Sequence, residues 1–181
     1  NDEKIKAKNG ITGYVDFSGT DAATVIQSAI NVLTNGGRIF IKSGIYTINS
    51  KINIVNNMIT IDGEGYSTVL KAGNSSSIFY GNRGTSLVEK IILRNMILDS
   101  NNVSNYAIEI YALWRSILEN LWIYNAINGI KLDTYEGYST NYGGVNWLNK
   151  ISVYQANQRA CHIRYETDTW LTDCEFSSIR E

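Results

Sequence analysis

Proline is missing from all 181 residues, whereas an average usage of about 5% would place roughly nine in a chain of this length. Histidine occurs once, as His162, which excludes a metal site built from several histidines. The two cysteines, Cys161 and Cys174, are too few for a disulfide framework, and we interpret them as small buried side chains rather than a bridge. No apolar run approaches the ~20 residues of a membrane-spanning helix, so no span is expected.

A surplus of positive charge is also missing, because 16 Lys and Arg face 17 Asp and Glu and the net charge is -1. Nucleic acid is therefore not expected as a partner, since proteins that bind it usually carry a basic surplus. Hydrophobic residues make up 44%, which is enough for one domain with its own core. Isoleucine and asparagine are abundant, and together they indicate many short strands joined by turns.

One segment has the periodicity of an amphipathic helix. Asp21 is a suitable N-cap and the Gly36-Gly37 pair a suitable stop, so the pattern predicts a helix over 21–34. We accordingly divide the chain into an N-terminal arm with a capping helix, 1–37, and a strand-rich part, 38–181. The helix repeats apolar residues at spacings of three and four, namely Ala22, Val25, Ile26, Ala29, Ile30 and Leu33.

An internal repeat dominates the strand-rich part. Each copy has a leucine, two polar residues, an apolar residue, any residue and a second apolar residue. A second strand motif recurs in phase with it, at Ile108–Ile110, Ile130–Leu132 and Cys161–Ile163. Two motifs in phase indicate one coil per repeat, which is a parallel β-solenoid. The copies of the first motif begin at Leu93, Leu118, Leu148 and Leu171.

Alternation along each strand predicts which side chains face the interior. We expect about five or more coils, with Met96, Leu121, Ile151 and Cys174 in one interior ladder. The longest step between copies holds a normal coil plus an inserted loop, at about 134–147, that is rich in tyrosine and glycine.

Motifs near the helix resemble the start of the pectate-lyase superfamily. They are Gly36-Gly37-Arg38-Ile39-Phe40-Ile41, Gly44-Ile45-Tyr46-Thr47-Ile48 and Ile61-Asp62-Gly63-Glu64-Gly65. The resemblance covers nearly the whole chain and implies an all-β, right-handed, single-stranded parallel β-helix capped by a short α-helix. No similar cap is visible at the C-terminal end, so we expect a continuation in a longer chain or, alternatively, a partner subunit as in a homotrimer.

The resemblance also implies a ligand, because proteins of this fold mostly bind or cut acidic polysaccharides along an outer face. Two outward columns carry candidate groups for that ligand: Glu109, Lys131 and His162 in one, and Tyr111, Asp133 and Arg164 in the next. Exposed ionic residues of mixed sign are also what any solenoid surface carries, so a plain solvated face remains an alternative.

The inserted loop begins directly beside Asp133. Its aromatic side chains suit stacking on sugar rings or, alternatively, a contact between subunits. Outside the loop, Trp122 at an outward position is open to the same two interpretations. The loop aromatics considered for binding or catalysis are Tyr135, Tyr138, Tyr142 and Trp147.

The segment Asp133-Thr134-Tyr135-Glu136 is similar in place and spacing to the Asp-Pro-His-Glu segment of the mannuronan epimerase and alginate lyase branch. Asp133 and Glu136 match its two acids. Thr134 stands in place of its proline, and Tyr135 stands in place of its catalytic histidine. The resemblance therefore implies a site at this point but departs from the pattern at the histidine.

Two reaction classes fit these residues. Elimination from a uronate needs a cation at the carboxylate, for which Arg164 or Lys131 is suitable, and a proton carrier, for which Tyr135 or His162 is suitable. Hydrolysis would instead use two carboxylates, Asp133 with Glu136 or with Glu109. No cofactor is expected; Ca²⁺ held by Asp133 and Glu136 is chemically feasible, but no calcium-loop spacing supports it.

The sequence leaves two functional hypotheses. The first is an extracellular, cell-surface or virion-borne β-helix that binds or processes a polysaccharide of the uronate type, as a lyase or a glycoside hydrolase if it is an enzyme. The second is a non-catalytic spike or adhesin domain in which the solenoid is a rigid stalk and the aromatic loop contacts partner subunits.

Overall fold

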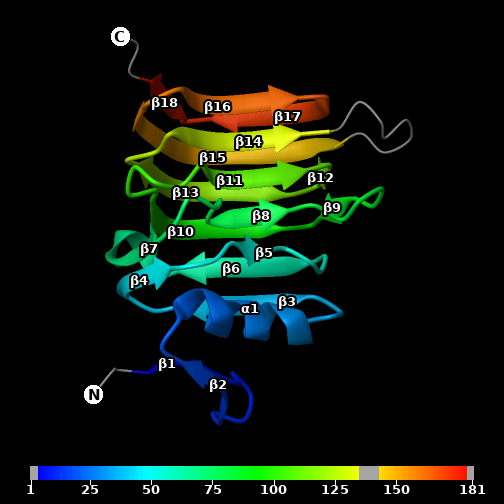
Figure 1. Cartoon of the computed structure of the whole chain (residues 1–181). Coiled ribbons are helices and arrows are strands. Elements are labelled where there is room, and N and C mark those ends of the chain that lie inside the picture. Colours follow the sequence, from blue (N-terminus) through cyan, green and yellow to red (C-terminus); the bar gives the residue numbers. More distant parts are fainter. Residues whose placement is uncertain (1–3, 135–142, 179–181) are drawn as a thin grey trace.

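The computed structural model describes residues 4–134 and 143–178, and its strands wind into a parallel β-helix of about five turns (Figure 1). This architecture, mostly parallel strands with one α-helix near the N-terminus, confirms the predicted fold class. Within the described chain, no helix has the length and apolar character of a membrane span.

The coils form two sheets, a long sheet of 11 strands and a five-stranded sheet. The five-stranded sheet stacks β5 (Ile52–Asn53), β8 (Phe79–Gly81), β11 (Tyr106–Tyr111), β14 (Asn128–Asp133) and β16 (Arg159–Arg164) in chain order. The long sheet contains β3 (Gly37–Ile41), β4 (Gly44–Ile48), β6 (Ile59–Gly63), β7 (Thr68–Ala72), β9 (Val88–Glu89), β10 (Ile92–Asp99), β12 (Leu113–Trp114), β13 (Ile117–Tyr124), β15 (Gly143–Ala156), β17 (Glu166–Thr172) and β18 (Glu175–Ser178).

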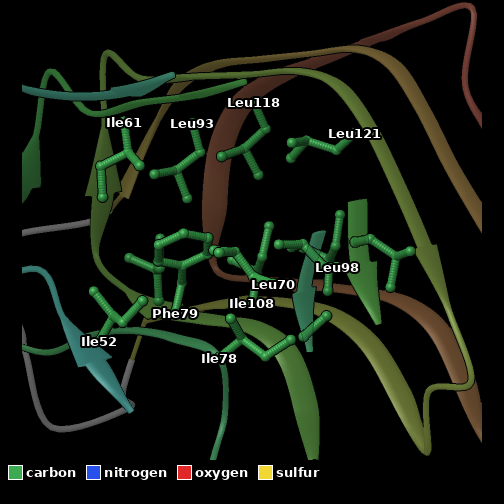
Figure 2. Close-up of a cluster of buried hydrophobic side chains, with 14 of the residues drawn as sticks. Ile52, Ile61, Leu70, Ile78, Phe79, Leu93, Leu98, Ile108, Leu118 and Leu121 are labelled. Atoms are coloured by element: carbon green, nitrogen blue, oxygen red, sulfur yellow. The ribbon is translucent and has the colours of Figure 1, made fainter. Parts of the chain in front are cut away.

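The interior is filled by ladders of like side chains from successive coils. Met96 pairs with Leu121 and Leu121 with Ile151, and each is at most 1% exposed. Cys174, just before β18, is partly buried against the same core, so the predicted ladder is present. Figure 2 shows parallel rows of this kind, including Ile61, Leu93 and Leu118, pointing into one apolar interior.

A left-handed backbone residue explains the spacing in the leucine motif. Asn95 in β10, Asn120 in β13 and Lys150 in β15 have φ of 58°, 48° and 52°. Each bends its strand, so the leucine before it and the apolar residue after it both face inward although they are three positions apart. Asparagine tolerates this conformation better than most residues. The Asn120 side-chain amide donates to Asn95 Oδ1 at 2.9 Å, which links the bends of adjacent coils.

The helix α1 (Ala22–Val32) covers the first coil as predicted. Asp21 is its N-cap and accepts from the Thr24 backbone N–H at 2.9 Å. Ile26 and Ile30 are 6% and 0% exposed against the core. The preceding arm forms an antiparallel ribbon of β1 (Ile5–Lys8) and β2 (Val15–Gly19), which packs on α1 at the bottom of Figure 1.

Candidate functional site

The outer face of the five-stranded sheet holds the two columns that the sequence predicts. Glu109 pairs with Lys131 and Lys131 with His162 across β11, β14 and β16. Tyr80 of β8 precedes Glu109 in the same column. Parallel strands lie about 4.8 Å apart, so the groups follow one another at that interval. The second column aligns Tyr111, Asp133 and Arg164.

Glu109, Tyr111 and Lys131 form a connected network on this face. The Tyr111 hydroxyl donates to Glu109 Oε1 at 2.8 Å and accepts from Lys131 Nζ at 2.6 Å. Lys131 Nζ also lies 3.4 Å from Glu109 Oε1, and the Ser77 hydroxyl donates to Glu109 Oε2 at 2.7 Å. The network fixes one ammonium and one carboxylate side by side.

The protonation states of this network follow from its burial and contacts. Burial raises the pKa of Tyr111 to about 12, so the phenol keeps its proton. Burial lowers the pKa of Lys131, but its contacts with Tyr111 and Glu109 outweigh burial and the pKa is raised overall. Lys131 is therefore a cation at any physiological pH.

Asp133 occupies an outward position yet is only 2% exposed. Arg164 in the next coil covers it, donating from Nε and from a terminal nitrogen to the two carboxylate oxygens at 3.0 Å each. The sequence predicts an outward column here but not this cover, which depends on a side chain 31 residues later. Arg164 itself is 47% exposed, so its guanidinium reaches the surface.

His162 is half-buried beside these charges. Burial lowers its pKa, and the cations Arg159, Arg164 and Lys131 lower it further, while Asp133 acts in the opposite direction. The imidazole is thus neutral at neutral pH. Its Nδ1 atom is buried and has no hydrogen-bond partner among the described residues. The imidazole is therefore in the unprotonated form that a general base requires, while the neighbouring cations weaken its basicity.

Aromatic rings extend the face toward the N-terminal coils. Lys51 Nζ lies 3.8 Å from the centre of the Tyr80 ring, and Tyr80 contacts Tyr111 edge to face at 6.2 Å. Lys131 Nζ lies 5.5 Å from the centre of the Tyr106 ring. The repeat does not mark these three residues: Lys51 and Tyr80 lie beside and in the short strands β5 and β8, and Tyr106 begins β11 before its repeated Ile108–Ile110 motif.

Sequence reasoning also missed Glu166, the first residue of β17. Its carboxyl accepts from Thr134 Oγ1 at 3.2 Å and from the Leu113 backbone N–H at 3.3 Å on one oxygen, and from the Asn146 amide at 3.3 Å on the other. Burial raises its pKa to about 8, with the Asp133 carboxylate acting in the same direction. At neutral pH this carboxyl therefore carries a proton.

A glycine makes room for the Glu166 side chain. Gly143 pairs with Glu166, and a Cβ at position 143 would lie 1.9 Å from Glu166 Oε2. The Gly143 N–H donates to Thr134 Oγ1 at 3.2 Å, so Thr134 and Gly143 meet beside the buried carboxyl. The glycine pair at 143–144 is the only feature of the sequence that could have indicated this buried carboxyl.

Trp147 and four residues of the inserted loop are the predicted site residues that remain. Trp147 lies in β15 of the long sheet, where it stacks on Trp170 at 5.2 Å, and is not brought together with the two columns.

Within 4–134 and 143–178, no three His, Cys, Asp or Glu side chains are grouped to hold a metal ion. Cys161 and Cys174 are both free. Four predicted residues, Tyr135, Glu136, Tyr138 and Tyr142, lie outside the described residues.

No family model matches the sequence, and no curated protein matches it either. Two solved structures are similar in fold. The A-module of the mannuronan C-5 epimerase AlgE4 from Azotobacter vinelandii matches with a TM-score of 0.61 at 12% identity, covering 85% of this chain. ORF18 of Geobacillus virus E2 matches with a TM-score of 0.53 at 16% identity, covering 96% of this chain.

The chain corresponds to just under half of each of these structures, 48% and 47% of their lengths. At such low identities the likeness concerns the fold. It agrees with the capping helix, the in-phase strand motifs and the N-terminal motifs of the sequence. The chain therefore has a parallel β-helix fold of the kind seen in these two structures.

Proposed function

We propose that the outer face of the five-stranded sheet binds an acidic polysaccharide of the uronate type. The observation that carries the proposal is the pair of aligned columns on that face, Glu109, Lys131 and His162 in one and Tyr111, Asp133 and Arg164 in the other, with one residue of each column on each successive coil. Regularly spaced groups match a regularly repeating polymer better than they match a single small molecule.

The charges of the face favour an anionic ligand. Lys51, Lys131, Arg159 and Arg164 outnumber the carboxylates Glu109 and Asp133, and the third carboxyl nearby, Glu166, is protonated at neutral pH. Guanidinium and ammonium groups bind carboxylates through charge-assisted hydrogen bonds. The Tyr80 and Tyr106 rings provide apolar faces for the sugar rings.

The comparison with known structures supports the same ligand class. One neighbour in fold is named as a mannuronan C-5 epimerase module, and mannuronan is a polymer of a uronic acid. Such polymers occur outside cells, so we place the protein in the extracellular space, on a cell surface or on a virion. The viral neighbour is compatible with a virion.

Binding can be tested with mannuronan, guluronan and polygalacturonate by isothermal titration calorimetry. Arg164→Ala is expected to weaken binding by roughly tenfold or more, because it removes an exposed guanidinium from the face. Arg38→Ala is the matched control: Arg38 pairs with buried Asp62 at 2.7 Å and is 57% exposed, but it lies on the long sheet. Equal losses in both variants, or no binding by the wild type, would refute the proposal.

Turnover of the bound polymer is a separate part of the proposal. Among the described residues of the two columns, we assign proton transfer to His162, because its imidazole is unprotonated at neutral pH and its Nδ1 atom has no hydrogen-bond partner among the described residues. Elimination would produce an unsaturated uronate, which absorbs in the ultraviolet, and hydrolysis would produce new reducing ends without that absorbance. Loss of either signal in His162→Gln, with polymer binding retained, would support the role.

A spike or adhesin without catalysis is the second candidate. The stacked pair Trp147 and Trp170 favours it, because the two indoles are 42% and 47% exposed on the long sheet and would be well placed between subunits. Sedimentation of the wild type and of Trp170→Ala distinguishes the two candidates. A trimer that Trp170→Ala dissociates, together with no glycan binding, would favour the spike.

A further inference from the structure

A second surface, on the long sheet, has a composition unlike that of the charged columns. Trp122 and Tyr124 from β13 and Tyr154 from β15 line a groove of about 460 Å³. Tyr124 and Tyr154 pair in register, so their rings lie on successive coils. Trp122 and Tyr154 are 40% and 49% exposed. Large aromatic side chains gathered at the surface in this way commonly mark a binding site.

The aromatic side chains of this groove are held in place before any ligand binds. The Trp122 ring is packed edge to face between Tyr66 at 5.7 Å and Tyr124 at 6.3 Å. Its neighbour in the next coil is Ser152, whose small side chain leaves the indole uncovered on that side. A ligand would therefore meet a fixed platform and would not have to order it.

A buried carboxylate fixes the edge of the same groove. Asp99 is 6% exposed and accepts from the Asn125 side-chain amide at 2.9 Å. It also accepts from the Tyr124 hydroxyl, and with burial this contact raises the pKa of that phenol. The negative charge of Asp99 faces Lys71 at 3.9 Å. The Asp99 carboxylate thus holds Asn125 and Tyr124 in place, but it is not one of the residues that line the groove.

The rim consists of uncharged amides. Asn102, Gln155 and Asn157 are exposed, and within the described chain their side-chain amides have no hydrogen-bond partner in the protein. An amide offers both donors and acceptors, as sugar hydroxyl groups do. Among the residues that the structure describes, no Asp, Glu, Lys or Arg lines the groove, so nothing there would compensate a charged ligand.

We propose that this groove binds a neutral oligosaccharide. Two aromatic rings one coil apart match sugar rings in sequence along a chain, and amides at the rim match their hydroxyl groups. The uncharged character of the described lining selects a neutral glycan over a uronate. The site is separate from the five-stranded sheet and does not depend on the function proposed for that face.

The test titrates the whole chain with maltohexaose, cellohexaose, mannohexaose and xylohexaose, each beside a hexauronate, by calorimetry and saturation-transfer NMR. Trp122→Ala and Tyr154→Ala are each expected to weaken binding of a neutral hexamer by roughly tenfold. Trp147→Ala is the matched control, because Trp147 is exposed to a similar degree outside the groove. Arg164→Ala should leave neutral binding unchanged, which separates this site from the charged face.

Circular dichroism is used to check that each variant is folded. If Trp122→Ala does not fold, Trp122→Phe replaces it in the titrations, because phenylalanine keeps a smaller aromatic ring at this position. The proposal is overturned if no neutral hexamer binds at millimolar concentration, or if Trp122→Ala and Tyr154→Ala bind as the wild type does. It is also overturned if the wild type is an oligomer that Trp122→Ala converts to a monomer, since the groove would then be a contact between copies of the chain.

Discussion

Arg164 and Asp133, on adjacent coils, share two parallel hydrogen bonds of 3.0 Å, with the carboxylate buried and the guanidinium half-exposed. The pair thus links an exposed side chain to a buried one on the outer face of the five-stranded sheet. Its two members are expected to respond differently to mutation, because only one of them is desolvated.

Removal of the guanidinium should cost more stability than removal of the carboxylate charge. Arg164→Ala leaves the buried Asp133 carboxylate without its main partner and is expected to lower the free energy of unfolding by about 1–3 kcal/mol. Asp133→Asn removes the charge from the buried position, while the Arg164 guanidinium is 47% exposed to water, so this variant should cost less. Urea denaturation of both variants and of the double variant measures the difference. A larger loss in Asp133→Asn would contradict the assignment.

Glu166 should make the protein less stable as pH rises. Burial raises its pKa from the usual 4.5 to about 8, so between these values the folded state holds a proton that the unfolded state releases. The stabilisation is complete below pH 4.5 and is lost as pH rises toward 8, by up to about 1.4 kcal/mol per pH unit.

Glu166→Gln tests this directly, because glutamine keeps the shape and part of the hydrogen bonding but cannot titrate. We expect its urea midpoint to vary less between pH 5 and pH 8 than that of the wild type. Glu175→Gln, an exposed carboxylate in the next strand β18, is the control. If wild type and Glu166→Gln show the same pH dependence, Glu166 does not hold the proton.

The bend at Asn120 should tolerate glycine better than alanine. Asn120→Ala places an ordinary residue at φ 48° and removes the hydrogen bond from the Asn120 side-chain amide to Asn95 Oδ1. We expect the free energy of unfolding to fall by about 1–2 kcal/mol. Asn120→Gly loses the same bond but relieves the backbone strain, so it should fall between alanine and the wild type. Thermal unfolding followed by circular dichroism gives the ranking, and an alanine variant as stable as the wild type would argue against the strained bend.

The capping helix should be sensitive to charge on one side only. Ile26→Asp buries a carboxylate over the first coil, where Ile26 is 6% exposed, and is expected to unfold or aggregate the protein. Val32→Asp, at a position 60% exposed on the same helix, should leave melting and monodispersity nearly unchanged. Size-exclusion chromatography and thermal melting report both results. Comparable behaviour of the two variants would show that α1 does not cap the core.

The coil was predictable because its signals are local and repeated. An apolar side chain at every second position, interrupted by a polar residue such as Asn95 or Asn120, recurs in each coil and fixes which residues point inward. The capping helix was predictable for a similar reason, since its N-cap and its apolar spacing lie within one short segment. The columns of Lys131, His162 and Arg164 follow from the same register.

The coil, its cap and the alignment of the columns follow from the amino-acid pattern, because strand register depends on alternation along one strand and repetition between strands. Three further features emerge only when the coils stack: Arg164 covers Asp133, Glu166 lies in space left by Gly143, and Trp122 shares a groove with Tyr154. They emerge only then because the exposure and pKa of an outward side chain depend on its neighbours in other coils, more than 20 residues away along the chain. No pattern within a single coil contains those neighbours.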